Sequence, residues 1–374
     1  MDKITFNDLN LSSDIKKAIE HMGFLHPTPI QIQAIPHILE GKDIIGQAET
    51  GTGKTAAFGI PALEMVDITQ KRVQVLVLCP TRELANQVAE EINLLSRYKD
   101  IKIQSIYGGQ SIERQIRTLK KGVHMVIGTP GRVMDHLQRN TLKLDNLKML
   151  VLDEADKMLD MGFREDIEVI LTRAPERRQT ILFSATMPKP IMKLTTQYQH
   201  EPLLIKTQQK NINVPQIEQF YFNTKGRPKH DILCRVIDNY EMKSSLVFCN
   251  TKKGVDELVG TLRRRGYLAD GLHGDMGQRQ RDEVMSGFRN GTIETLVATD
   301  VASRGIDVKN IEAVFNYDIP QDTESYIHRI GRTGRAGKEG RAFTFAASRD
   351  IYRIKNIQKY TNTVIRCKEL PAVQ

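Results

Sequence analysis

A candidate phosphate-binding loop occurs early in the chain. Residues 48–55 read AETGTGKT, between a short apolar run and an apolar helical pattern. This is close to the P-loop pattern, with Ala48 in place of its first glycine. Gly51 and Gly53 let the backbone turn several N–H groups toward one phosphate, and Lys54 can reach the β- and γ-phosphates. The residues expected to hold the nucleotide are Ala48, Glu49, Thr50, Gly51, Thr52, Gly53, Lys54 and Thr55.

Two adjacent carboxylates stand at the end of a later apolar run. Residues 149–153 read MLVLD, and DEAD occupies residues 153–156. A strand-terminal carboxylate beside a P-loop is a candidate Mg²⁺ ligand, so Asp153 and the Thr55 hydroxyl form the expected metal site. Glu154 is placed to polarise an attacking water. The two motifs together indicate NTP hydrolysis, because a candidate base accompanies the nucleotide site.

Alternating apolar runs and helical patterns predict the elements that position these groups. The first series of runs lies at residues 43–46, 73–79, 125–128, 149–153 and 180–184. A second series lies at residues 246–249, 295–299, 313–317 and 342–346. Continuous apolar runs between helices are typical of buried parallel strands. We therefore expect an α/β fold of two similar domains, each a mostly parallel sheet flanked by helices.

A polar segment is expected to separate the two domains. Residues 207–215 read TQQKNINVP and end in Val-Pro, which is typical of a linker. The predicted domains are residues 1–206 and 216–365, followed by a tail at 366–374.

Composition and charge limit the classes of protein. The chain has 54 Lys and Arg against 45 Asp and Glu, a net charge of +9, and residues 207–374 supply +7 of it (27 minus 20). This excess suits a polyanion such as nucleic acid. No apolar run approaches the ~20 residues that span a bilayer, so no membrane association is expected. The four cysteines form no CxxC pair, which disfavours a zinc site and fits a reducing cytoplasm.

The order of motifs resembles the DEAD-box family of ATP-dependent RNA helicases over essentially the whole chain. The further motifs are GFLHPTPIQ at 23–31, PTRELANQ at 80–87, GG at 108–109, TPGR at 129–132, SAT at 184–186, VFCNT at 247–251, TDVASRGID at 299–307 and HRIGRTGR at 328–335. The resemblance implies two tandem RecA-like domains that bind ATP and RNA across their interface. It also implies local, non-processive separation of RNA duplexes or remodelling of RNA–protein complexes.

Adenine recognition is expected near the N-terminus. The Gln31 amide can donate one hydrogen bond and accept another, which matches the N6/N7 edge of adenine. Phe6 or Phe24 could stack on the base, although Phe24 could equally be a core residue. By resemblance, Asp307 contacts the ribose or the γ-phosphate side of the interface.

Three arginines of the second domain are expected to contribute to the ATP site. Arg329, Arg332 and Arg335 are spaced i, i+3, i+6, which would place them near one helical face. The resemblance implies that Arg332 and Arg335 act as arginine fingers, an effect worth ~10³–10⁵ in rate. With Lys54 and Glu154 they form the expected catalytic set. The resemblance also implies that ATP is coupled to RNA through Asp156, Ser184, Thr186 and Arg329.

The resemblance also implies an RNA surface. Its expected residues are Pro80, Thr81, Arg82, Gly109, Thr129, Pro130, Gly131, Arg132, Thr251, Arg281 and Thr299. Hydroxyls, glycine N–H groups and arginines suit contacts to phosphate and sugar, so binding should be independent of base sequence. Contacts to the 2′-OH would distinguish RNA from DNA.

Other functions remain open at this stage. The chain could be an ATP-dependent RNA clamp that serves as a scaffold for other proteins, since slow turnover would be compatible with all of the motifs. A DNA helicase or translocase of the same superfamily is a second alternative, which the adenine-reading motif disfavours. A nucleotide kinase built on the P-loop would leave the second domain unexplained.

Overall fold

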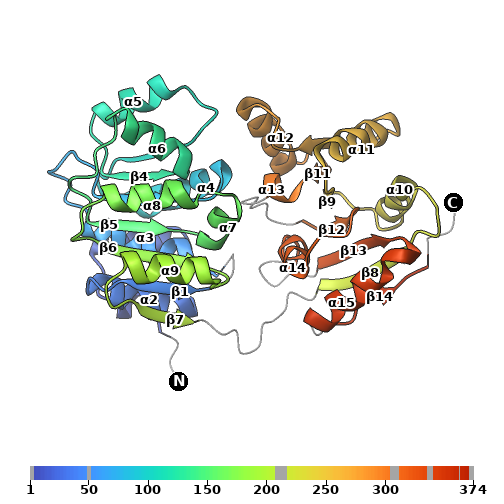
Figure 1. Ribbon diagram of the computed structural model, residues 1–374, viewed down its shortest axis with the longest axis horizontal. Coiled ribbons are helices and arrows are strands. Elements are labelled where there is room, and N and C mark those ends of the chain that lie inside the picture. Colours follow the sequence, from blue (N-terminus) through green and yellow to red (C-terminus); the bar gives the residue numbers. More distant parts are fainter. Residues whose placement is uncertain are drawn as a thin grey trace. The chain divides into compact units, whose positions relative to one another are not determined.

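The computed structural model describes residues 4–48, 52–206, 217–303, 311–334, 340–361 and 363–369. The chain divides into two compact units, Met1–Gln209 and Lys210–Gln374 (Figure 1). The predicted linker at 207–215 lies outside the described residues.

The described part of the first unit contains a seven-stranded sheet in the order β3-β4-β2-β5-β6-β1-β7. Its strands are β1 (Ile44–Gln47), β2 (Val75–Leu78), β3 (Ile103–Ile106), β4 (Met125–Gly128), β5 (Met149–Leu152), β6 (Gln179–Ser184) and β7 (Leu203–Lys206). All of these strand pairs are parallel. The central strands are buried on both faces, which explains their continuous apolar runs.

Helices cover both faces of this sheet. They are α1 (Ser13–His21), α2 (Pro29–Leu39), α3 (Lys54–Met65), α4 (Arg82–Leu95), α5 (Ile112–Lys120), α6 (Pro130–Gln138), α7 (Ala155–Asp160), α8 (Arg164–Arg173) and α9 (Lys189–Tyr198), after a short 3₁₀ turn at Phe6–Asp8. Val75 and Val77 pack in one cluster with α1 to α4, whereas Leu76 and Leu78 pack in the other with α6 to α9. This alternation follows from the two-residue period of a strand.

The second unit repeats this architecture. Its described strands are β8 (Ile217–Asn223), β9 (Ser245–Phe248), β10 (Ala269–Leu272), β11 (Thr295–Ala298), β12 (Ala313–Asn316), β13 (Gly340–Ala346) and β14 (Arg366–Cys367). They form a parallel sheet in the order β10-β11-β9-β12-β13-β8-β14. Numbered within each unit, both sheets have the order 3-4-2-5-6-1-7. The predicted α/β fold with two similar parallel sheets is confirmed.

The helices of the second unit also lie on both faces of its sheet. They are α10 (Lys229–Asn239), α11 (Lys252–Arg264), α12 (Gln278–Asn290), α13 (Asp300–Ser303), α14 (Thr323–Ile330) and α15 (Ile351–Thr361), with a 3₁₀ turn at Ser348–Asp350. Helices α10 and α11 share a core with Phe343, whose ring lies 5.2 Å from that of Phe315. Helices α12 and α13 pack against the opposite face.

Two further observations concern the predicted tail and membranes. Residues 366–367, which the sequence assigned to a tail, form β14 and pair with Phe220 and Tyr221 of β8. Within the described ranges, no helix has the length and apolar character needed to cross a bilayer.

Candidate active site

The P-loop lysine and the first DEAD carboxylate meet at the carboxyl edge of the first sheet. Lys54 begins α3 and Asp153 follows β5, with exposures of 6% and 3%. Lys54 Nζ donates to Ala48 O at 3.2 Å and lies 4.0 Å from Asp153 Oδ1. That carboxylate oxygen has no hydrogen-bond partner among the described residues. A buried carboxylate oxygen without a hydrogen-bond partner, beside a lysine expected to bind phosphate, is a suitable ligand for a hard cation such as Mg²⁺.

The environment of Asp153 opposes its ionisation. Burial raises the pKa of Asp153 to about 6, although the Lys54 ammonium pulls it down, and the Glu154 carboxylate adds to the rise. Positive charge brought to this site would therefore favour the ionised carboxylate.

Glu154 is held in an unusual backbone conformation. It precedes α7 with φ 52° and ψ 50°, in the left-handed region that residues other than glycine enter at a cost of about 1–3 kcal/mol. Its side chain is 3% exposed, and its Oε2 lies 2.8 Å from Lys157 Nζ. The Lys157 ammonium lies beside this buried carboxylate and compensates its negative charge. Such strain is common at functional sites.

Direct hydrogen bonds join the DEAD and SAT motifs. Asp156 Oδ2 accepts from the Thr186 backbone N–H at 2.8 Å and from the Thr186 hydroxyl at 3.0 Å. Ser184 Oγ accepts from the Asp156 N–H at 3.3 Å and donates to Thr186 O at 2.7 Å. The structure thus brings together the three predicted coupling residues of the first unit, and a shift of α7 would reach the loop after β6.

Gln31 connects the N-terminus of α2 to the P-loop. Its Oε1 accepts from the Thr28 N–H at 2.9 Å, and its Nε2 donates to Gly53 O at 3.0 Å. Gly53 has φ +86°, and a Cβ there would lie 2.5 Å from Gln31 Nε2, so the position requires glycine. The amide keeps one N–H and one lone pair for adenine.

Both predicted stacking residues contact the core of the first unit. Phe6 is 5% exposed and belongs to the core cluster beside α1 to α4, and the partly buried Phe24 packs against the same cluster. Stacking of either ring on adenine remains a prediction.

Two predicted RNA-binding threonines cap helices at the carboxyl edge of the first sheet. Thr81 precedes α4 and its hydroxyl accepts from the Leu84 N–H at 3.2 Å, while Thr129 precedes α6. Helix N-termini at these points present N–H groups and positive charge, which suit phosphates. Gly109 has φ +88°, and the Arg82 guanidinium occupies the space where a Cβ would lie. This close approach explains the glycine beside a predicted phosphate contact.

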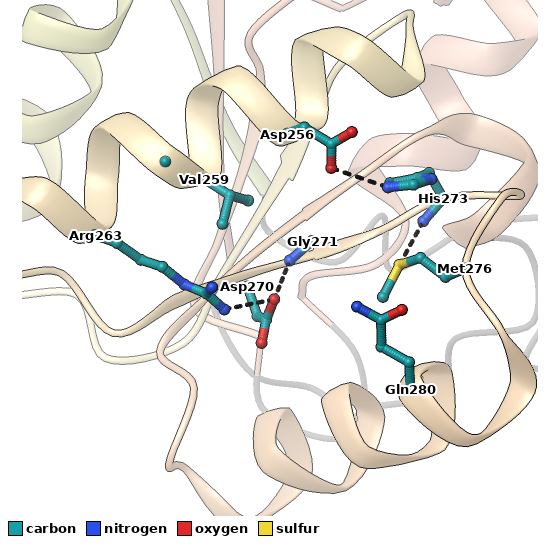
Figure 2. A pocket seen from close by; sticks show the side chains of 9 residues that line it. Asp256, Val259, Arg263, Asp270, Gly271, His273, Met276 and Gln280 are labelled. Atoms are coloured by element: carbon teal, nitrogen blue, oxygen red, sulfur yellow. Dashed lines mark hydrogen bonds and ion pairs between the residues drawn. The ribbon is translucent and has the colours of Figure 1, made fainter.

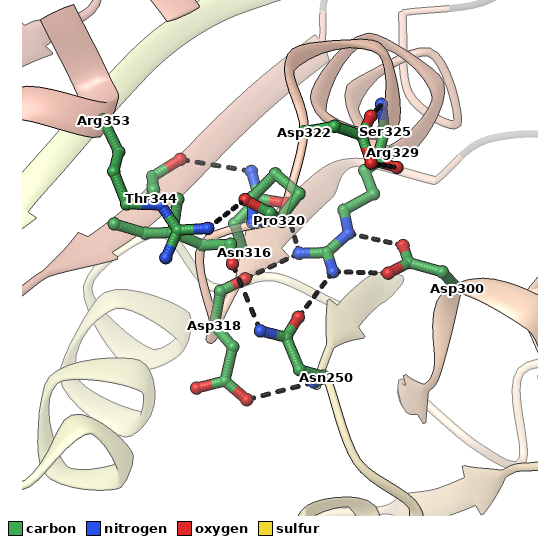
Figure 3. A network of polar contacts seen from close by, with 11 residues as sticks. Asn250, Asp300, Asn316, Asp318, Pro320, Asp322, Ser325, Arg329, Thr344 and Arg353 are labelled. Atoms are coloured by element: carbon green, nitrogen blue, oxygen red, sulfur yellow. Dashed lines mark hydrogen bonds and ion pairs between the residues drawn. The ribbon is translucent and has the colours of Figure 1, made fainter. Parts of the chain in front are cut away.

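In the second unit, Arg329 is the centre of a buried polar network (Figure 3). It is 1% exposed, and its Nε and Nη2 donate to Asp300 at 2.6 and 2.7 Å. Nη2 also donates to Asn250 Oδ1, and Nη1 donates to Asp318 O and Asn316 Oδ1. All five guanidinium N–H groups are thereby engaged. Arg329 therefore holds together the carboxyl ends of β9, β11 and β12.

The helical face predicted for the three arginines is wrong. Helix α14 ends at Ile330 and Gly331 follows it, so Arg332 lies beyond the helix. Arg329 is committed to the buried network, whereas Arg332 is 6% exposed in the turn after the helix. Spacing alone therefore did not place Arg329 and Arg332 on one helical face.

Two of the three predicted RNA-binding residues of the second unit, Thr251 and Thr299, lie shortly after strands. Thr251 is exposed, and its hydroxyl accepts from the Gly254 N–H at 3.0 Å at the start of α11. Thr299 directly follows β11. Arg281, 8% exposed in α12, donates to His273 O at 3.2 Å, which ties it to the loop after β10.

Comparisons with known proteins agree with this arrangement. The DEAD/DEAH box helicase model matches residues 28–194, and the helicase conserved C-terminal domain model matches residues 228–337. The "DEAD-box ATP-dependent RNA helicase CshA" of Bacillus cereus (strain ATCC 10987 / NRS 248) is 52% identical over 369 residues, which cover 99% of this chain and 70% of that relative. This chain belongs to the DEAD-box helicase family.

Solved structures of DEAD-box proteins share the fold. S. cerevisiae Dbp5, solved bound to RNA and ADP BeF3, has a TM-score of 0.88 at 33% identity and covers 98% of this chain and 95% of its own. A DEAD box protein from the hyperthermophile Methanococcus jannaschii has a TM-score of 0.57 at 44% identity. The match covers 99% of this chain and 100% of that protein's chain. Both of the RecA-like domains expected for a DEAD-box protein are therefore present.

Some of the predicted DEAD-box residues lie outside the described part of the chain. These are Glu49, Thr50, Gly51, Asp307 and Arg335. Thr55 is described and lies half-buried in the first turn of α3, so both predicted metal ligands belong to elements that begin or end at the carboxyl edge.

Sequence reasoning missed several residues that hold the DEAD-box site together. Asn250 lies in the motif at 247–251 and Asp300 in the motif at 299–307, so a role for these two residues could have been predicted from the sequence. Gln115 and His136 carry no such signal, because their partners become apparent only when α5 and α6 pack together.

A pocket of about 240 Å³ in the second unit lies between α11 and the β10–α12 region (Figure 2). Its lining includes the ion pair of Arg263 with Asp270 at 2.7 Å and the hydrogen bond between His273 Nε2 and Asp256 Oδ1 at 3.0 Å. Its charged groups already have partners, and it contains none of the predicted ATP or RNA residues.

Proposed function

We propose that this chain is an ATP-dependent RNA helicase that couples ATP binding and hydrolysis to local, non-processive separation of RNA duplexes or remodelling of RNA–protein complexes. One observation carries the proposal. The buried group of Lys54, Asp153 and Glu154 is connected through Asp156 to the SAT loop, on the sheet edge that also bears the predicted RNA contacts. A nucleotide site joined in this way can pass its state to an RNA site.

Lys54 and the P-loop backbone would hold the phosphates of ATP, and Gln31 would read adenine with the N–H and lone pair that it has left. Asp153 and Thr55 would hold Mg²⁺, which supplies charge neutralisation at the β- and γ-phosphates. Among the described residues, no cluster of three or more histidine, cysteine or acidic side chains could bind a metal alone. A site with few protein ligands suits Mg²⁺, since water and substrate oxygens complete its coordination.

Glu154 would accept the proton of the attacking water, because it is a buried carboxylate fixed by backbone geometry and by Lys157. Arg332 and Arg335 would neutralise charge on the γ-phosphate when the two domains close on ATP and RNA. Closure is favoured because each ligand gains contacts from both domains only in the closed state.

Activity should fall below about pH 6 in a manner that depends on Mg²⁺. The pKa of Asp153 is raised by burial to about 6, so below this pH the folded protein carries a neutral carboxyl that is a poor metal ligand. Metal and proton compete for the same oxygen, so raising Mg²⁺ should move the acid limb to lower pH. The measurement is kcat/KM for ATP against pH at limiting and at excess Mg²⁺. An acid limb that does not move with Mg²⁺ would refute the assignment of Asp153.

RNA would be held along its backbone by the helix N-termini after β2, β4 and β9, which carry Thr81, Thr129 and Thr251. Such contacts carry no base information, so binding should be independent of sequence. We also propose a cytoplasmic location, because all four cysteines are free.

The function is tested by steady-state ATP hydrolysis with no nucleic acid, with single-stranded RNA, and with DNA of the same sequence. Strong stimulation by RNA alone is expected, because discrimination depends on the 2′-OH. Equal stimulation by DNA would favour the translocase alternative. RNA binding that requires ATP but brings no turnover would favour the clamp.

A further inference from the structure

Arg132 is a predicted RNA contact whose side chain is fixed by the protein. Its Nη1 donates to Gln110 O at 3.1 Å and to Gln115 Oε1 at 3.0 Å, which uses both of its N–H groups. Its Nε lies 3.8 Å from Asp135 Oδ2. Nη2 has no hydrogen-bond partner among the described residues, and the side chain is 14% exposed. The guanidinium is thus held along one edge while its other nitrogen remains for a ligand.

The amide of Gln115 has only one favourable orientation. Gln115 is 2% exposed, and its Oε1 accepts from Arg132 and lies 3.0 Å from His136 Nε2. Its Nε2 donates to Tyr107 O at 3.1 Å. A flipped amide would place its NH₂ group against the Arg132 donor and its oxygen against the Tyr107 carbonyl. These two partners therefore keep Oε1 directed at Arg132.

His136 faces the same Gln115 oxygen from a fully buried position. It is 0% exposed, and burial lowers its pKa, with the Arg132 charge acting in the same direction. The ring is therefore neutral and carries one N–H. Because Arg132 and Tyr107 O fix Gln115 with Oε1 toward His136 Nε2, that nitrogen is assigned the N–H, which donates to Gln115. Nδ1 then accepts from the Thr141 hydroxyl at 2.8 Å, whose alternative acceptor is His136 O at 3.1 Å.

The same set of contacts orders the GG loop. The Tyr107 hydroxyl accepts from Asn86 Nδ2 at 2.8 Å and from Gln110 Nε2 at 2.7 Å. The backbone oxygen of Gln110 in turn accepts a hydrogen bond from Arg132 Nη1. Two predicted RNA-binding segments, residues 108–109 and 129–132, are thereby connected through Arg132 and through Tyr107, Gln110 and Gln115, which lie outside both segments.

We infer that Gln115 and His136 are positioning residues for RNA binding, which fix Arg132 so that Nη2 can donate to a backbone phosphate. The inference rests on the proposed function, since Arg132 must contact RNA for its orientation to matter. Neither residue would touch RNA itself, because both are buried. Their effect is to reduce the freedom that Arg132 loses on binding.

A double-mutant cycle tests the role of Gln115. ATP hydrolysis at saturating ATP is measured against the concentration of single-stranded polyuridine for wild type, Gln115→Met, Arg132→Ala and the double variant. Gln115→Met should raise the half-saturating RNA concentration about 3- to 10-fold, the size that corresponds to the net contribution of a typical intramolecular hydrogen bond. The kcat at saturating RNA should stay within about twofold. In the Arg132→Ala background, Gln115→Met should have no further effect.

Matched variants separate positioning from packing. Gln104→Met removes a glutamine of β3 that donates only to Ser105 O, and it should leave the half-saturating RNA concentration unchanged. His136→Leu should reproduce the effect of Gln115→Met, whereas His136→Gln retains an N–H donor and should behave within about twofold of wild type.

Equal effects of His136→Leu and His136→Gln, or an undiminished effect of Gln115→Met in the Arg132→Ala background, would overturn the inference. So would an unchanged half-saturating RNA concentration in a folded Gln115→Met variant. If wild type itself shows no RNA stimulation, the proposed function fails, so the two failures are distinguishable.

Discussion

Replacing Glu154 with glutamine is expected to reduce kcat for ATP hydrolysis about 10²- to 10⁴-fold, with KM or Kd for ATP nearly unchanged. Glutamine keeps the size and polarity of the side chain but cannot accept a proton, so the general-base contribution is lost. The P-loop contacts through Lys54 do not involve this side chain. The measurement is single-turnover hydrolysis together with equilibrium binding of a fluorescent ATP analogue.

The same substitution should trap RNA on the enzyme. If hydrolysis reopens the domains, a variant that binds ATP without cleaving it should release single-stranded RNA more slowly than wild type. Glu168→Gln is a suitable control, because Glu168 pairs with Arg164 on the surface of α8 at 2.9 Å. Normal turnover by Glu154→Gln would show that another group activates the water.

Replacing Arg329 with methionine should destabilise the second unit by about 3–5 kcal/mol, because it leaves a buried charge network without its central cation. Asp300 would lose both of its bonds to the guanidinium, and Asn250 and Asp318 O would each lose a donor. The Asp300 side chain is 36% exposed, so water can compensate part of the loss and the lower end of this range is expected. Hydrogen exchange followed by mass spectrometry over β9, β11 and β12 would measure the change.

Two comparisons make this result interpretable. Exchange in the first unit should be unchanged, which controls for the condition of the sample. Arg353→Met removes a single donor to Pro320 O at 2.6 Å and should cost only about 1 kcal/mol. An Arg329→Met variant as stable as Arg353→Met would show that the network contributes little to folding.

The strands that sequence patterns predicted and those that they missed differ in their place in the sheet. The runs at 73–79, 125–128 and 149–153 correspond to β2, β4 and β5, which are buried on both faces. The edge strands β3 and β7 were missed, since IQSI and LLIK are only partly buried. In the second sheet, the edge strand β14 and the adjacent β8 were missed because they are exposed or only partly buried. The edge strand β10 is mostly buried, but its sequence ADGL contains no continuous apolar run. A continuous apolar run indicates a strand that is buried on both faces, and an edge strand is usually less buried than that.

The candidate site shows a similar division. The proximity of Lys54 and Asp153 was predictable, because both follow strands of one parallel sheet whose carboxyl ends share an edge. The spacing of the arginines wrongly predicted one helical face, although Gly331 in the sequence indicated that the helix ends there. The contact between Gln115 and His136 could not be predicted from the sequence, since it joins residues 21 positions apart on two different helices.

The most direct test of the account is the separation of a short RNA duplex in which one strand carries a fluorophore and the other a quencher. We expect ATP to drive strand release by wild type, Glu154→Gln to fail under multiple-turnover conditions, and lengthening of the duplex to reduce release sharply. A DNA duplex of the same sequence should stay intact. If release of the RNA strand were the same with and without ATP, or if the DNA duplex opened equally well, the assignment as an ATP-dependent RNA helicase would be contradicted.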